Sequence, residues 1–165
     1  MIPPIVVMGV SGVGKSTIGE ALALALSVPF RDADDFHPPA NVAKMAAGTP
    51  LTDADRAPWL DAIGAHLAAH PAGCVVTCSA LKRAYRDRLR AAAPGLRLVF
   101  LHGDPALVAA RQAARVGHFM PASLVASQFA TLEPPAPAEG ALALDVTDPP
   151  DTLLAVALTA LRSQP

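Results

Sequence analysis

The chain has 165 residues, of which 52% are hydrophobic and 16% are charged, and its formal net charge is -1 at pH 7. This length is typical of one domain with a substantial core, so we expect residues 1–165 to form a single domain. The small net charge excludes a strong overall attraction to nucleic acid or to an anionic membrane surface, so we expect neither as a partner.

The N-terminus and the two cysteines indicate a cytoplasmic protein. A β-branched run begins within a few residues of Met1, and no basic segment with an apolar stretch and a cleavage site precedes it. No apolar run approaches the roughly 20 residues that span a bilayer. Cys74 and Cys78 lie four residues apart in a predicted strand, an arrangement that suits small core residues better than a disulfide or a metal site.

Residues 9–16 read Gly-Val-Ser-Gly-Val-Gly-Lys-Ser and fit the phosphate-binding pattern G-x-x-x-x-G-K-[ST] at every fixed position. They lie between a β-branched run at 5–8 and a predicted helix at 16–26, which is the order that the motif requires. Backbone N–H groups of the loop and the positive end of the helix would bind an anion.

This loop predicts a nucleotide site. Lys15, a predicted catalytic residue, would reach the β- and γ-phosphates, and the Ser16 hydroxyl would bind Mg²⁺. The residues expected to contact the nucleotide are nine from the loop and one from a later helix: Gly9, Val10, Ser11, Gly12, Val13, Gly14, Lys15, Ser16, Thr17 and Arg111.

Several carboxylates follow the second predicted strand, at 29–32. Such a group costs free energy unless a positive charge faces it. We expect Asp34 to orient and deprotonate an acceptor hydroxyl, and Asp32 to contact the metal through water. The alternative is turn and capping chemistry, for which Asp35 or His37 would serve.

Thr52 and Asp55 form a predicted capping box at the start of a helix. Arg56 then lies near the amino end, where the helix dipole disfavours a cation. An anionic partner is therefore expected, and it is either Asp53 or Asp55 nearby or a carboxylate of the substrate. The residues themselves leave both possibilities open.

Lys82 follows an apolar strand predicted at 73–78, and ligands bind at the carboxyl ends of strands in open α/β sheets. Lys82 is therefore a candidate contact for an anion. Four arginines alternate with Asp87 along the next helix and are predicted to form a solvated face rather than a nucleic-acid patch: Arg83, Arg86, Arg88 and Arg90.

Arg111 and Arg115 lie one helical turn apart, just before Gly117-His118-Phe119. Two arginines beside a glycine suit a lid over phosphates, expected at approximately 111–122. In that interpretation Arg115 stabilises charge on the transferring group and is catalytic. A solvated helix face is the alternative.

Five apolar segments separated by helices predict an α/β three-layer fold with a parallel sheet. The expected strands are 5–8, 29–32, 73–78, 96–101 and 141–146.

Across nearly the whole chain, these motifs resemble the small P-loop gluconokinases, which are relatives of shikimate kinase and the nucleoside monophosphate kinases. The resemblance depends on the loop at 8–16, on Asp34 with His37-Pro38, on the block from Asn41 to Leu60, and on Cys78-Ser79-Ala80-Leu81-Lys82, Tyr85-Arg86, Gly117-His118-Phe119-Met120, Gln128-Phe129 and Leu132-Glu133-Pro134.

The resemblance implies the P-loop kinase fold with strand order 2-3-1-4-5 and a mobile lid, ATP and Mg²⁺ as cofactors, and commonly a homodimer. It implies ATP-dependent phosphorylation of D-gluconate at its 6-hydroxyl, giving 6-phospho-D-gluconate. By position, Asp34 would face the acceptor hydroxyl, Arg56 and Lys82 would hold the carboxylate or hydroxyls of gluconate, and His118 of the lid would also bind the substrate.

The sequence departs from the family pattern at Ala33, where a glycine is usual, and at Pro39-Ala40, which replace more polar residues. Two alternatives to a gluconate kinase follow from the fold. One is a kinase of another small hydroxy acid such as shikimate, and the other is a nucleotide-binding switch without catalysis. The Asn41 to Leu60 block argues against the first, and the absence of an Asn-Lys-x-Asp guanine segment argues against a GTPase switch.

Overall fold

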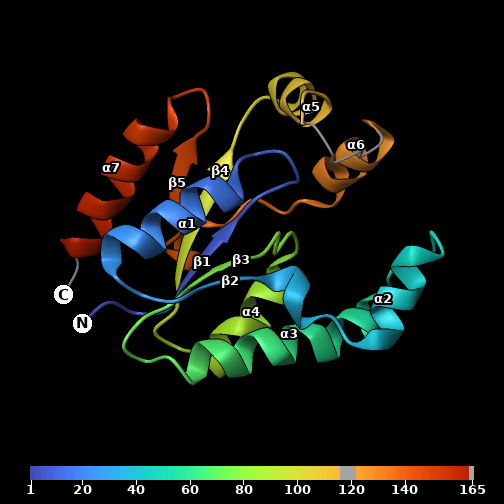
Figure 1. Ribbon diagram of the computed structural model, residues 1–165, viewed down its shortest axis with the longest axis horizontal. Coiled ribbons are helices and arrows are strands. Elements are labelled where there is room, and N and C mark those ends of the chain that lie inside the picture. The colour runs from blue at the N-terminus through green and yellow to red at the C-terminus, as the bar shows by residue number, and fades with distance from the viewer. Residues whose placement is uncertain (116–121, 164–165) are drawn as a thin grey trace.

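The computed structural model describes residues 1–115 and 122–163, which include a five-stranded parallel sheet (Figure 1). The strand order is β2-β3-β1-β4-β5, as the family resemblance implied. The strands are β1 Ile5–Met8, β2 Phe30–Asp32, β3 Val75–Thr77, β4 Arg97–His102 and β5 Leu142–Asp145.

Helices cover both faces of the sheet and confirm the three-layer prediction. Helix α1 (Lys15–Leu26) packs beside α7 (Pro150–Arg162) on one face, and α3 (Asp53–Ala68) packs beside α4 (Arg83–Ala92) on the other (Figure 1). The remaining elements are η1 Ala33–Phe36, α2 Pro39–Ala46, α5 Pro105–Ala113, α6 Ala122–Thr131 and η2 Pro137–Glu139.

Each face of the sheet has its own apolar core. Ile5 and Val7 of β1 point into the core under α1 and α7, whereas Val6 and Met8 point into the core under α3 and α4. Successive side chains of a strand alternate between faces, so a strand covered on both sides must be apolar throughout. This requirement explains the continuous apolar runs in the sequence.

Most helix starts are where capping residues predicted them. Thr52 and Asp55 form the capping box of α3, and the Asp104 carboxylate accepts a hydrogen bond from the Ala106 N–H at the start of α5. The last helix begins at Pro150, two residues before the expected start at Thr152, because proline is well suited to the first helical position.

The predicted solvated face of α4 is wrong at Arg86, whose side chain is 0% exposed. Its Nε lies 2.7 Å from Oε1 of Glu139, and its Nη1 donates to the carbonyl oxygens of Ala80 and Leu81. The hydrogen bonds from Arg86 are the largest cause that lowers the pKa of Glu139 to about 2. A guanidinium can be buried here because a carboxylate and two carbonyls satisfy it.

Candidate active site

The phosphate-binding loop has a backbone that only glycine adopts easily at its key positions. Gly9 has φ 147° and Gly12 has φ 85°. A Cβ added to Gly9 would lie 2.5 Å from the carbonyl oxygen of Leu101, and one added to Gly12 would lie 2.7 Å from Oε1 of Gln112. The loop is therefore held closely against β4 and α5, in the strand–loop–helix context that the motif predicted.

Lys15 folds back over this loop. Its Nζ donates to the carbonyl oxygens of Gly9 and Val10, each at 2.9 Å. Burial lowers the pKa of Lys15 to about 8, and Arg115 acts in the same direction, while Asp32 and Asp34 oppose the shift. The ammonium group is thus removed from water and has two carbonyl partners that an anion could replace.

A cavity of about 800 Å³ opens beside the loop, a volume within the usual range for small-ligand sites. Seven predicted nucleotide residues line it, whereas Val10 and Val13 are buried in the core. The lining residues are Ser11, Gly12, Gly14, Lys15, Ser16, Thr17, Asp32, Ala33, Asp34, Met45, Trp59, Thr77, Cys78, Ser79, Arg111, Gln112, Arg115 and Gln128.

Asp32 and Asp34 line the same cavity, at the end of β2. The N–H of Asp34 donates to Oδ1 of Asp32 at 2.9 Å, so Asp32 caps the start of η1, and the backbone N–H of His37 closes its end on the carbonyl oxygen of Asp34. No side chain caps the start of α2, whose N-cap is Pro38, so of the expected turn and capping chemistry only this turn is present. Burial, and then the charge of Asp32, raises the pKa of Asp34. A raised pKa is typical of carboxylates that exchange protons near neutral pH.

His37 lies at the edge of this carboxylate group. Its ring stacks on Trp59 with centroids 4.5 Å apart, its Nδ1 lies 3.3 Å from Nδ2 of Asn41, and its Nε2 lies 4.0 Å from Oδ1 of Asp34. Burial lowers the pKa of His37, which favours the neutral ring. His37 therefore supports the wall of the site.

Arg56 and Lys82 are not among the described residues that line the cavity. Both lie close to Asp53: Nζ of Lys82 is 3.3 Å from its carboxylate, and Nη1 of Arg56 is 3.8 Å away. Arg56 also donates to the carbonyl oxygen of Leu51 at 2.9 Å, and the Tyr85 hydroxyl donates to Asp53. The local ion pair, one of the two expected partners of Arg56, is present.

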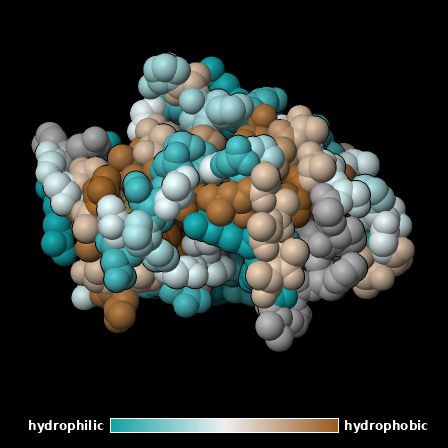
Figure 2. All heavy atoms as spheres, turned by 90° about the horizontal axis from the view of Figure 1, so that it is seen from above, coloured by the Kyte–Doolittle hydropathy of each residue, from teal (hydrophilic) through white to brown (hydrophobic). Residues whose placement is uncertain are grey.

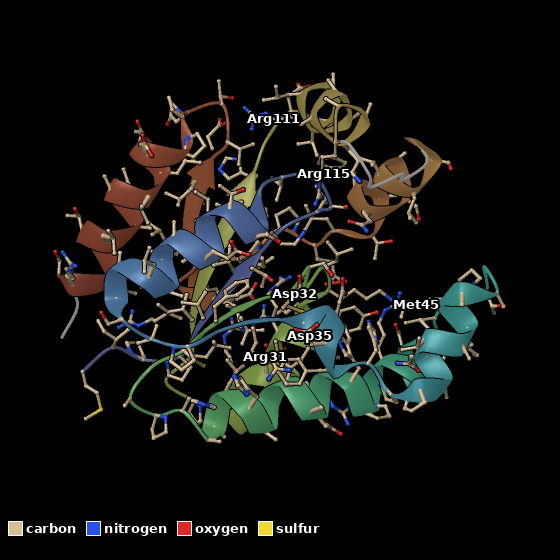
Figure 3. All side chains as sticks on the ribbon, in the orientation of Figure 1. Arg31, Asp32, Asp35, Met45, Arg111 and Arg115 are labelled. Carbon is tan, nitrogen blue, oxygen red and sulfur yellow. The ribbon has the colours of Figure 1, made fainter. Side chains whose placement is uncertain are left out.

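The predicted lid begins on α5. Arg111 lines the cavity from this helix and Arg115 lines it from just beyond the helix end, and Figure 3 shows both above Asp32, toward α5. Half of the expected lid at 111–122, residues 116–121 including His118, lies outside the described residues.

Two glutamines that no sequence pattern singled out as functional also contact the loop. The Ser11 N–H donates to Oε1 of Gln128 on α6 at 2.6 Å. Gln112 on α5 is 4% exposed, packs against Gly12, and has an Oε1 with no hydrogen-bond partner in the described part of the chain. Gln128 belongs to a family motif, but a lone glutamine in a helix carries no chemical signature of its own.

A family model described as AAA domain matches residues 5–135. The chain is 49% identical over 157 residues to the gluconokinase of Gluconobacter oxydans (strain 621H), covering 91% of this chain and 86% of that one. The chain belongs to the gluconokinase family. The thermoresistant gluconokinase of Escherichia coli (strain K12) is 40% identical over 161 residues and is covered to 92% of its length.

Solved structures agree with membership of the gluconokinase family. A crystal structure of a gluconokinase from Sinorhizobium meliloti 1021 superposes with a TM-score of 0.89 at 52% identity, covering 97% of this chain and 91% of that one. A shikimate kinase from Bacteroides thetaiotaomicron superposes with a TM-score of 0.71 at 17% identity, which shows a shared fold alone.

Proposed function

We propose that this protein transfers the γ-phosphoryl group of ATP to the 6-hydroxyl of D-gluconate, giving 6-phospho-D-gluconate and ADP. The observation that carries this proposal is the joint lining of one cavity by Lys15 and Asp34, in a chain of the gluconokinase family. A kinase for shikimate or another hydroxy acid is not favoured, because the shikimate kinase neighbour shares only the fold.

On the nucleotide side, the N–H groups of the loop and the amino end of α1 would bind the phosphates. Lys15 would exchange its two carbonyl partners for phosphate oxygens, and Arg111 of α5 and Arg115, just after that helix, would approach them. Positive groups placed around the γ-phosphate stabilise the charge that it spreads during transfer. The residues proposed for the nucleotide are thus the loop residues 9–17 with Arg111, and Arg115 acts on the transferring group.

In the transfer step, a bond forms between O6 of gluconate and the γ-phosphorus while the bond from that phosphorus to the β–γ bridging oxygen breaks. The proton of the 6-hydroxyl passes to the carboxylate of Asp34. Although the Asp34 side chain is 85% exposed, desolvation beside the cavity wall and then the charge of Asp32 raise its pKa above the usual value, which makes it a better proton acceptor than an isolated aspartate.

The residues present fit a Mg²⁺ ion. Ser16 and Asp32 line the same cavity, and Oδ1 of Asp32 accepts the Asp34 N–H, while its other oxygen accepts no hydrogen bond from the described residues and could face a metal-bound water. Hydroxyl and carboxylate oxygens are the ligands that Mg²⁺ prefers. When bound, the ion supplies charge neutralisation for the phosphates.

On the acceptor side, Arg56 and Lys82 would bind the carboxylate or hydroxyls of gluconate, with His118 as a further contact from the lid. Their present partner, Asp53, has a side chain that is 65% exposed. Ion pairs with such an exposed group are weak because water screens them, so a substrate anion can compete for these two cations at little cost.

We further propose one catalytic domain over residues 1–165, a lid at approximately 111–122, a cytoplasmic location and a homodimer. No helix within 1–115 and 122–163 is long and apolar enough to cross a membrane. Figure 2 shows hydrophilic and hydrophobic residues interspersed over the visible face. Exposed large hydrophobic side chains belong to several elements, so we assign no dimer face: they include Leu24, Val42, Met45, Leu124 and Val156.

The deciding experiment measures ADP release from ATP and Mg²⁺ with D-gluconate, shikimate, glucose, other aldonic acids or no acceptor. We expect release that depends on gluconate, with the product identified as 6-phospho-D-gluconate. Release without any acceptor would favour a nucleotide switch, and release with shikimate alone would favour the other kinase class.

A further inference from the structure

A second group of chemically reactive side chains lies away from the cavity, near the carboxyl end of α3. One ligating atom from each of His66, His70 and Cys74 lies within 4.8 Å of the other two. His66 and His70 are one helical turn apart, and Cys74 immediately precedes β3. The group is separate from the proposed substrate site, because His66 is about 15 Å along α3 from Arg56 at the usual rise per residue.

Both histidines have a nitrogen available for a ligand. Nδ1 of His70 lies 2.7 Å from the carbonyl oxygen of His66, so in the neutral ring Nδ1 donates and Nε2 carries the lone pair. Nε2 of His66 is buried and has no hydrogen-bond partner within the described ranges. An unpaired buried nitrogen costs free energy unless something binds it.

The surroundings of His66 favour its neutral ring. Burial, followed by the neighbouring His70 and Arg31, lowers the pKa of His66. The guanidinium of Arg31 lies 4.9 Å from the centroid of the Phe36 ring, which in turn packs on His66, and Arg31 pairs with Asp35 at 3.7 Å. The nearby positive charge is therefore partly compensated by a carboxylate.

We propose that His66, His70 and Cys74 bind one divalent cation of the zinc class, with water as the fourth ligand. Two imidazole nitrogens and one thiolate are a ligand set that Zn²⁺ accepts in tetrahedral geometry. The hydrogen bond from His70 to a backbone carbonyl is the kind of outer contact that orients metal-bound histidines.

The bound ion would join the carboxyl end of α3 to the amino end of β3. Cys74 is buried, and burial raises the pKa of its thiol to about 11, so the thiol carries its proton before the metal binds. Formation of the metal–sulfur bond releases that proton to solvent.

Titration of the metal-free full chain with Co²⁺, in the absence of nucleotide, tests the site. We expect one equivalent to bind, with the intense visible bands of tetrahedral cobalt and a sulfur-to-cobalt charge-transfer band. Zn²⁺ should displace the cobalt and raise the Tm. Cys74→Ser should lose the charge-transfer band, and His70→Ala should bind at least about 10–100-fold more weakly, as loss of even outer contacts does.

Cys78→Ser is the matched thiol control and should keep the charge-transfer band, while His102→Ala is the matched histidine control. Circular dichroism of each metal-free variant establishes that it folds. If Cys74→Ser does not fold, His70→Ala decides the test, because His70 is partly exposed. Absence of saturable binding of both ions overturns the proposal. So does a charge-transfer band that survives Cys74→Ser, or an affinity that His70→Ala leaves unchanged.

Discussion

The nucleotide side of the cavity and the proposed acceptor side, a charged group around Asp53, are built in different ways. The nucleotide side is formed largely by backbone, with glycine conformations held in place by β4 and α5. The acceptor side contains charged side chains that satisfy one another, with Asp53 close to Arg56, Lys82 and Tyr85. The first is preorganised for an anion, whereas the second, in the role proposed for it, would exchange partners when a substrate binds.

The largest expected effect is that of Asp34→Asn, which removes the proposed proton acceptor while keeping the size of the side chain. We expect kcat to fall by about 10²–10⁴-fold, the usual contribution of a positioned general base. Steady-state kinetics measure this, and binding of ATP should stay close to that of the parent protein. A variant with nearly normal kcat would exclude Asp34 as the base.

Lys15→Ala tests the preorganised side. We expect kcat to fall by about 10²–10³-fold, because one cationic donor to the transferring phosphoryl group is lost. Lys44→Ala is the matched control, since Lys44 pairs with Asp55 at 2.7 Å and is not among the described lining residues. Equal kcat values for the two variants would contradict the role of Lys15.

Arg56→Ala tests the exchange of partners on the acceptor side. We expect KM for gluconate to rise by about 10–100-fold, the value of a hydrogen bond to a charged group, with little change in KM for ATP. Arg88→Ala is the control, because Arg88 pairs with Asp61 on the surface. An unchanged KM for gluconate would exclude Arg56 from substrate binding and leave it only the ion pair with Asp53.

The pH dependence sharpens the description of Lys15. Its pKa in the free protein is lowered to about 8, so its charge is lost as the pH rises through that value. We expect kcat/KM for ATP to decline above about pH 8, approaching tenfold per pH unit, whereas kcat should decline later because bound phosphates favour the charged form. If kcat and kcat/KM for ATP declined over the same pH range, that result would argue against a contact between Lys15 and the phosphates.

The smallest expected effect is that of Gln128→Ala, which removes the acceptor of the Ser11 N–H. A hydrogen bond of this kind contributes about 0.5–1.5 kcal/mol, so we expect KM for ATP to change by about 2–10-fold. A change confined to KM for gluconate would show that α6 acts on the other half of the site.

The sequence predicted the strand–loop–helix unit around the motif at 9–16 because the information for it is local. The structure also confirms the predicted parallel sheet. It could be predicted because continuous apolar runs identify strands that are buried on both faces. The strand order came from the family resemblance.

Contacts between distant segments could not be predicted from local pattern. Arg86 sits among other arginines, and its partner Glu139 is 53 residues away, so nothing in the spacing of α4 marks it as buried. Gln112 and Gln128 contact the loop through the packing of α5 and α6. For Arg56, the helix dipole correctly indicated an anionic neighbour but did not distinguish a protein carboxylate from a substrate.

The buried pair of Arg86 and Glu139 has a mechanical consequence. Arg86 binds the carbonyls of Ala80 and Leu81, in the loop after β3, while Glu139 lies in the connector that follows α6. The connector is thereby fastened to the rigid sheet just beyond α6. If α6 rotates toward the nucleotide, this connector holds its carboxyl end in place. Its amino end, next to the predicted lid, would then move furthest.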